Sequence, residues 1–234
     1  MQNLPKAEIY ELFYHCTTWK YLVDAVVRKI NERKPTQVLD LCCGTGLLSS
    51  LITPPEFGYT GVDLEPEYIQ YAREHNRKLT HYFHCADAFW WDDRTVYPMV
   101  VCLGGIHHIP EKNQEQFVQQ LVANLSRGGC LIVGDPLLSE FTTPLERRLC
   151  ALELGTAYLK ATQELGAPES ITASVADIIG NDILQVEWKT SLSRTRAMLS
   201  PHFKHVRTFK TWPNTVVDGR FGDYYHVLND PKNK

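Results

Sequence analysis

Short apolar runs rich in β-branched residues alternate with longer amphipathic stretches along the chain as far as residue 135. The apolar runs are too short for helices and are bounded by turn residues, so they predict strands. The predicted strands span residues 37–41, 59–63, 80–84, 99–103 and 130–134. The amphipathic stretches predict helices over residues 7–31, 46–52, 66–78 and 114–126. Strands that alternate with helices at this spacing predict right-handed crossovers and a doubly wound parallel sheet.

The pattern changes after Asp135-Pro136, where helical periodicity takes over from alternation. It covers residues 141–166 and 174–200, and two further strand candidates at 205–210 and 224–228 close the chain. The helical insertion is too apolar for a flexible linker, so it predicts a cap over one edge of the sheet.

The expected fold class is therefore α/β, with a Rossmann-like, doubly wound, mostly parallel seven-stranded sheet and a helical cap insertion between strands five and six. We expect residues 1–234 to form a single domain. Its ligand-binding core would span residues 36–140 and its cap subregion residues 141–200.

Composition narrows the range of partners. Lys and Arg total 24 against 27 acidic residues, a net charge of −3, so no bulk positive field favours nucleic acid or an anionic membrane. The seven cysteines show no zinc-ligand spacing, and we expect them to be reduced in a cytoplasmic protein. The N-terminus lacks a signal-peptide pattern, and no window approaches a membrane-spanning run of apolar residues.

The stretch VLDLCCGTGLL, residues 38–48, ends a predicted strand in a glycine turn. In an open α/β sheet, ligands bind beyond the carboxyl ends of the strands where the strand order reverses. Gly44 and Gly46 lack a Cβ, so the backbone could approach a ligand closely there, and the following helix would aim free N–H groups at it. A tight strand-to-helix turn with no ligand is the simpler alternative.

Acids follow the next two predicted strands. Asp63 ends the strand 59–63, where a carboxylate could accept hydrogen bonds from both hydroxyls of a ribose. Asp87 follows the strand 80–84 and could accept from the amino group of an adenine. Helix capping and a solvated loop acid are the respective alternatives. Taken with the glycine turn, the two acids predict an adenosine site.

Dinucleotide and nucleotide-triphosphate fingerprints fit this site poorly. A G-x-G-x-x-G pattern beginning at Gly44 needs a third glycine where Ser49 stands, and no P-loop pattern occurs.

The run of residues 38–46 resembles the first motif of class I S-adenosylmethionine-dependent methyltransferases, an acid followed by G-x-G-x-G. Asp63 matches the ribose-binding acid of that family, Asp87 its adenine-side acid, and residues 125–129 its L-x-x-G-G turn. The resemblance covers residues 36–135 in the family's order. Two departures are Cys42 at the first glycine of the motif and Tyr97-Pro98 where an acid usually precedes strand four.

The resemblance implies a cofactor, S-adenosyl-L-methionine, and transfer of its methyl group. Asp40 would face the cationic methionine end, the glycines would admit its backbone, and Asp63 and Asp87 would hold the ribose and adenine. The residues expected around the cofactor are Asp40, Cys42, Gly44, Thr45, Gly46, Asp63, Leu64, Ala86, Asp87, Ala88 and Leu103.

Two histidines and an acid are candidates for the acceptor side. His107 and His108 follow the strand 99–103, and an imidazole near neutral pKa suits proton removal from a hydroxyl or ammonium group. Asp135 at the end of strand five could be a base or a contact to a cationic acceptor. Scaffolding for the histidines and capping for Asp135 are the alternatives. Further aromatic and basic candidates are Tyr14, His15, Arg147, Arg148, Tyr158, Trp188, Tyr224, Tyr225 and His226.

Residues 103–106 read Leu-Gly-Gly-Ile, whereas the family's adenine-DNA and glutamine-amide subgroups carry Asn/Asp-Pro-Pro-Tyr/Phe there. The sequence therefore favours a small-molecule acceptor, methylated on oxygen or nitrogen, without a metal, nucleic acid or membrane partner. Two alternatives remain: a related enzyme with non-methylating chemistry such as a cyclase, and a cofactor-binding scaffold for a partner subunit, which would expose an apolar face on residues 141–200. The sequence leaves the oligomeric state open, a homodimer included.

Overall fold

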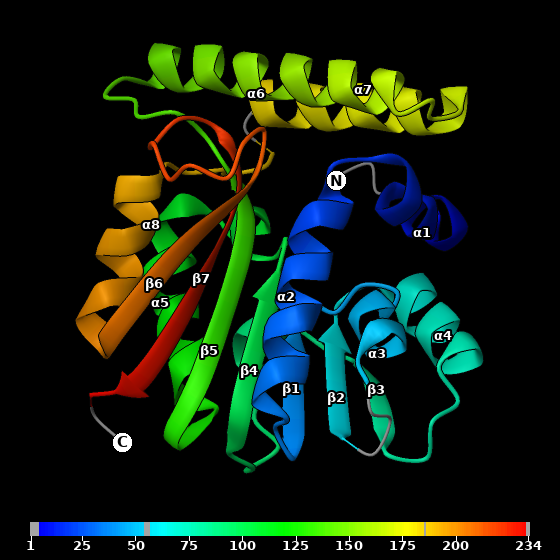
Figure 1. Ribbon diagram of the computed structural model, residues 1–234, viewed down its shortest axis with the longest axis vertical. Coiled ribbons are helices and arrows are strands. Elements are labelled where there is room, and N and C mark those ends of the chain that lie inside the picture. Colours follow the sequence, from blue (N-terminus) through cyan, green and yellow to red (C-terminus); the bar gives the residue numbers. More distant parts are fainter. Residues whose placement is uncertain (1–4, 54–56, 185, 233–234) are drawn as a thin grey trace.

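The computed structural model describes residues 5–53, 57–184 and 186–232. It contains a seven-stranded sheet in the order β3-β2-β1-β4-β5-β7-β6 (Figure 1). The strands are β1 (Gln37–Leu41), β2 (Gly58–Asp63), β3 (His81–Cys85), β4 (Tyr97–Leu103), β5 (Leu125–Leu137), β6 (Phe203–Trp212) and β7 (Gly222–Pro231). Strands β1 to β5 are parallel, and β7 is antiparallel to both β5 and β6. The expected α/β class and doubly wound, mostly parallel seven-stranded sheet are confirmed.

Helices cover both faces of the sheet, because its central strands are apolar on both faces. The helices are α1 (Ala7–Cys16), α2 (Trp19–Arg33), α3 (Leu47–Leu51), α4 (Pro66–His75), α5 (Glu111–Ala123), α6 (Pro144–Glu164), α7 (Glu169–Ile183) and α8 (Leu192–Leu199). Val38 and Val101 belong to the core shared with α2, α3 and α4, whereas Leu39 and Val100 belong to the core shared with α5. Alternate residues of one strand thus enter different cores.

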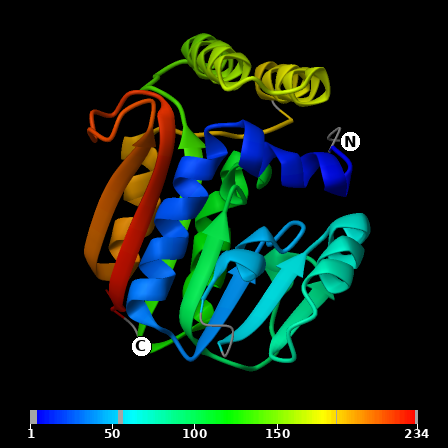
Figure 2. The same cartoon turned by 45° about the vertical axis from the view of Figure 1, so that its right-hand side comes forward.

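Helices α6 and α7 lie across the carboxyl ends of the parallel strands, with α1 beneath α7 (Figures 1 and 2). Phe13 of α1 packs with Ile171 and Val175 of α7, which ties the N-terminal helix to this cap. Helix α8 instead packs beside the sheet, because its Leu199 is buried in the same core as Phe117 of α5. The helices that overlie the sheet edge are therefore α6 and α7, which span only part of residues 141–200.

Three predicted helices have different bounds in the structure. The helix expected at 7–31 is divided in two, because Thr17 is extended and its hydroxyl caps the carbonyl of Phe13. The helix expected at 174–200 is interrupted between α7 and α8. Helix α5 begins at Glu111 after Pro110, three residues before the predicted start at residue 114.

The contact between α6 and α7 gives a test of the cap. A Cβ on Gly155 would lie 2.5 Å from Cγ1 of Ile179, whereas a Cβ on Gly180 would meet nothing within 4 Å. We expect Gly155→Ala to lower the free energy of unfolding by about 1–3 kcal/mol through overpacking. Gly180→Ala, the matched control, should raise it by up to about 1 kcal/mol through helix propensity. Urea unfolding of both variants measures this, and a stabilised Gly155→Ala would contradict the close contact.

Candidate functional site

The glycine turn after β1 is built from left-handed backbone conformations. Cys42, Gly44 and Gly46 have φ angles of 68°, 53° and 77°. A Cβ on Gly46 would lie 2.8 Å from the Phe83 ring, so this position has no room for a side chain. Cys42 stands at the position where the resembled motif has a glycine, and its positive φ gives the physical reason for that glycine.

Asp63 holds the glycine turn against the end of β2. Its Oδ2 accepts a hydrogen bond from the Gly44 N–H at 2.8 Å, and its Oδ1 accepts one from the Glu65 N–H at 3.0 Å. The Ala86 N–H donates to the Asp63 carbonyl at 2.9 Å, which joins the ends of β2 and β3. The structure therefore brings Gly44 and Asp63 into contact, with Ala86 beside them.

The other residues expected around the cofactor lie near this turn, with different exposures. Asp87 is exposed, and its carboxylate accepts from the Phe89 N–H at 2.9 Å at the start of a short 3₁₀ helix that begins with the buried Ala88. Leu64 is exposed, and Leu103 is half-buried at the end of β4. Asp87 thus has a capping contact that the sequence analysis did not predict for it, and its carboxylate is exposed, as in the solvated loop acid left as the alternative.

Asp40 is buried beneath the turn. The Tyr59 hydroxyl donates to its Oδ2, while Oδ1 has no hydrogen-bond partner among the described residues. Burial raises the pKa of Asp40 to about 7, with the Tyr59 hydrogen bond opposing and Asp63 adding to the rise. A buried carboxyl oxygen without a partner fits a ligand that carries a positive charge or a hydrogen-bond donor.

Helix α1 covers the turn from above. A Cβ on Gly44 would lie 3.2 Å from the Tyr10 ring, and the Thr45 hydroxyl donates to the Glu11 carboxylate. Tyr10 and Glu11 were missed by the sequence analysis, since nothing in the amphipathic pattern of residues 7–31 distinguishes them. Tyr14, which it did single out, donates to Asp24 at 2.7 Å on α2.

A cavity of about 150 Å³ lies under α6 and α7 and reaches Tyr10 and Gly104 at the glycine-turn end. Its walls are mostly apolar and aromatic, and one end is polar. The polar end includes His107, His108, Asp182, Glu187, Lys189 and Asp223. The cap therefore encloses a space next to the predicted adenosine site.

His107 and Asp135 form a buried pair in this polar end. The distance from His107 Nδ1 to Asp135 Oδ1 is 2.6 Å. Burial lowers the pKa of His107 to about 4, so the imidazole is neutral at pH 7. Burial raises the pKa of Asp135 to about 7. In its ionised form the Asp135 carboxylate can only accept, which places the imidazole proton on Nδ1 and leaves the Nε2 lone pair available. The sequence named both residues, and the structure brings them together.

His108 lies beside this pair, with its ring centroid 4.1 Å from that of His107. Burial, with His107 and other neighbours, lowers the pKa of His108 to about 3, so it too is neutral.

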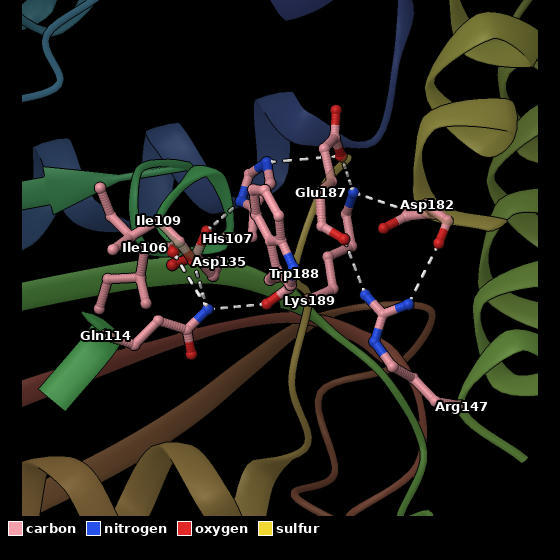
Figure 3. A network of polar contacts seen from close by, with 10 residues as sticks. All are labelled: Ile106, His107, Ile109, Gln114, Asp135, Arg147, Asp182, Glu187, Trp188 and Lys189. Carbon is pink, nitrogen blue, oxygen red and sulfur yellow. Dashed lines mark hydrogen bonds and ion pairs between the residues drawn. The ribbon is translucent and has the colours of Figure 1, made fainter. Parts of the chain in front are cut away.

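The segment 187–189 is fixed by hydrogen bonds to the loop that carries His107 (Figure 3). The Trp188 N–H donates to the His107 carbonyl at 2.7 Å, and the Gln114 amide donates to the Trp188 carbonyl at 2.8 Å. Arg147, a sequence candidate, donates to the carbonyls of Asp182 and Glu187 at 3.1 and 2.9 Å. Arg147 therefore orders the backbone of this segment.

Lys189 supplies a buried positive charge at the same place. Its ammonium donates to Asp182 Oδ2 at 2.7 Å and also to Glu187. His107, His108 and Glu187 could offer metal ligands, since one atom from each lies within 4.8 Å of the others. The Lys189 ammonium, however, already binds the same Glu187 oxygen that faces His107 Nε2 at 3.9 Å. The Lys189 ammonium thus supplies the positive charge that a metal ion would bring to this cluster.

Comparisons with known proteins show what part of the chain resembles. Residues 38–129 match a family model described as a methyltransferase domain. The chain is 25% identical over 118 residues to the ubiquinone biosynthesis O-methyltransferase of Rickettsia felis, covering 49% of this chain and 47% of that protein. For the Rickettsia conorii protein of the same description the identity is 27% over 121 residues, covering 50% and 40%. The chain spans about half the length of the curated relatives it matches.

Solved structures of methyltransferases share the fold. The plantazolicin methyltransferase BpumL superposes with a TM-score of 0.64 at 15% identity, covering 96% of this chain and 90% of that one. Magnesium protoporphyrin IX methyltransferase from Synechocystis PCC 6803 gives 0.59 at 18% identity, covering 90% and 83%. The strand order and these matches show that the chain shares the fold of solved methyltransferases and that residues 38–129 resemble a methyltransferase domain.

The buried Asp40 yields a prediction on pH dependence. Its folded pKa of about 7 exceeds the ordinary value of 3.8, so its contribution to stability is present at low pH and is lost as pH rises from about 4 to about 7. Asparagine does not ionise, so Asp40→Asn should not lose stability through this group as pH rises. We expect the variant's free energy of unfolding, relative to wild type, to increase over that pH range and then level off. Denaturant titrations without cofactor at several pH values test this, and a flat difference would contradict a buried, protonatable Asp40.

Proposed function

We propose that this chain transfers the methyl group of S-adenosyl-L-methionine to an oxygen or nitrogen atom of a small-molecule metabolite. The observation that carries the proposal is the enclosed cavity with the His107–Asp135 pair at one end. Its lining includes Gly104 after β4 and Tyr10, whose ring would lie 3.2 Å from a Cβ on Gly44 of the glycine turn. A methyl transfer that also removes a proton requires a base and the methyl-donor site to lie on either side of the same acceptor.

The residues of the glycine turn fit the methyl donor. Gly44 and Gly46, which lack a Cβ, let the rings of Tyr10 and Phe83 pack closely against the turn, and Asp63 has carboxylate oxygens positioned between the ends of β1 and β2. The unpartnered oxygen of Asp40 suits the cationic methionine end. When bound, S-adenosyl-L-methionine supplies an activated sulfonium methyl group.

The acceptor side depends on this chain's own residues. His107 would take the proton of the acceptor at Nε2, and Asp135 would stabilise the resulting imidazolium through Nδ1. His108 lines the same cavity and would shape the acceptor's position. Trp19, whose ring would lie 3.2 Å from a Cβ on Gly104, lines the cavity beside that glycine.

The size of the enclosed space supports a small acceptor. A cavity of about 150 Å³ beneath two helices has room for a small acceptor group. Relatives described as acting in ubiquinone biosynthesis and on magnesium protoporphyrin IX are consistent with small-molecule substrates.

A scaffold for a partner subunit is the less favoured function. Helix α6 does expose Leu145, Leu149 and Leu152, as that alternative expected. The opposite side of α6, however, lines the cavity with Leu154 and Tyr158. A cap that encloses a space beside a catalytic pair is better explained by an enzyme.

A cytoplasmic location also remains our proposal. All seven cysteines are free thiols, as a reducing compartment would keep them. Within the described residues, no helix has the length and apolar character needed to cross a membrane. The oligomeric state, homodimer included, stays a prediction.

Removal of Asp63 tests the donor site. We expect Asp63→Ala to weaken binding of S-adenosylhomocysteine by roughly 10²- to 10⁴-fold, since two hydrogen bonds to a charged acceptor, worth roughly 1.5–3 kcal/mol each, are lost. Isothermal titration calorimetry gives the affinity. Asp92→Ala, which removes an exposed acid from a loop after β3, is the control and should bind as wild type does. Equal affinity for Asp63→Ala and wild type would refute the ribose assignment.

Removal of His107 tests the base. We expect His107→Asn to lower kcat by roughly 10²- to 10⁴-fold while the affinity for S-adenosylhomocysteine stays unchanged, since proton removal contributes by that factor. His205→Asn, an exposed histidine on β6, is the matched control. Release of S-adenosylhomocysteine during turnover measures kcat for both variants, and calorimetry measures their affinity for S-adenosylhomocysteine. Retention of full activity by His107→Asn would leave the histidine as scaffolding only.

A further inference from the structure

Two buried carboxyl groups that line the cavity lack a hydrogen-bond partner for one oxygen each. Asp223 on β7 is 0% exposed, and its Oδ1 has no partner among the described residues, while Oδ2 accepts from the Thr18 hydroxyl at 3.3 Å. Asp182 on α7 is 2% exposed, and its Oδ1 is likewise unpartnered within the described chain. A buried acceptor oxygen without a donor is costly, so both call for a donor from a ligand.

The charges around the cavity favour a cation. Three carboxyl groups line it, from Asp182, Glu187 and Asp223, against the single ammonium of Lys189. Although burial opposes it, Lys189 and the two histidines hold the pKa of Glu187 at about 2, so the Glu187–Lys189 pair is internally balanced. An anionic acceptor would meet surplus carboxyl groups, whereas a cationic acceptor would complement them.

Aromatic rings from three helices line the same space. They are Tyr10, Phe13, Trp19 and Tyr158. Tyr158 lies close to the acid, since its hydroxyl accepts from the Trp19 N–H at 3.2 Å and Thr18, the residue before Trp19, contacts Asp223. Aromatic faces attract ammonium groups, and the attraction grows when the cation is desolvated. A carboxyl group next to aromatic rings is the combination that binds amines.

Asp223 is also fixed relative to the catalytic pair. It pairs with Pro136 in the register between β5 and β7, and Pro136 directly follows Asp135. The anchor for a cation and the proposed base therefore lie on neighbouring strands at the same end of the sheet.

We propose that the acceptor is a primary or secondary amine on an apolar, ring-containing body, bound through Asp223 with the rings of Trp19 and Tyr158 beside it. This inference rests on the proposed methyl transfer and selects nitrogen over oxygen. The ammonium proton goes to His107 Nε2, and the freed nitrogen lone pair forms the new N–C bond. The methyl–sulfur bond breaks with its electron pair on sulfur, which leaves a neutral thioether and a methylated amine.

Three probes with one apolar body and different head groups test the inference. Phenethylamine carries an amine, 2-phenylethanol a hydroxyl and 3-phenylpropanoate a carboxylate. Calorimetry on the full chain with S-adenosylhomocysteine present should show the amine binding roughly 10- to 100-fold more tightly than the alcohol, with the carboxylate weakest. Equal or tighter binding of the alcohol or the carboxylate, or no binding of any probe, would overturn it.

Variants assign the preference to the named residues. Asp223→Asn should remove the preference for the amine and leave the affinity for the alcohol within about threefold. Asp230→Asn, at the far end of the same strand, should keep the preference. Trp19→Leu provides a second test that leaves the buried acid in place, and it should reduce amine binding selectively. If Asp223→Asn and Trp19→Leu both weaken binding of the amine and the alcohol equally, the proposed role of Asp223 in binding the amine is contradicted.

The test separates this inference from the proposed function. If S-adenosylhomocysteine forms with the alcohol but not with the amine, the proposed amine acceptor is refuted and the proposed methyl transfer still holds. Amine-selective binding by a chain that binds no S-adenosylhomocysteine would keep the amine site and refute the methyl transfer.

Discussion

The parallel pairing of β1 with β2 and β4, and of β4 with β5, is the constraint on which the whole site depends. Asp40 lies in register with Gly61 and Val101, and Leu103 lies in register with Gly134. This register brings the glycine turn, the loop with His107, and Asp135 to one edge of the sheet. A slip of one residue in any pair would turn those side chains to the opposite face.

Burial of ionisable groups at this edge works against the stability of the isolated chain. Burial raises the pKa of Asp40, Asp135 and Asp223 to about 7 each, while it lowers that of His107 to about 4. An apolar core of the same shape would be more stable, because partly satisfied polar groups in a low dielectric are unfavourable. Buried ionisable groups gathered at one edge of the sheet are what a binding site for a polar, partly cationic ligand requires.

The sequence predicted the parts of the site that are encoded locally. The turn with Gly44, and Asp63 at the next strand end, follow from short motifs on adjacent strands. Asp182, Glu187 and Lys189 could not be found this way, since charges on an amphipathic segment normally face solvent and only tertiary packing buries these. Asp223 and Tyr10 come from opposite ends of the chain, so their approach to the cavity has no local signal.

The central claim is that a methyl group passes from a donor at the glycine turn to a small molecule under the cap. The most direct measurement is incubation of the purified chain with S-adenosylmethionine that carries a deuterated methyl group and a metabolite extract, followed by mass spectrometry. The account predicts at least one small molecule that gains the deuterated methyl group only when the active chain is present. Conversion of the donor without any labelled small molecule, or no conversion by a chain that binds the donor, would contradict it.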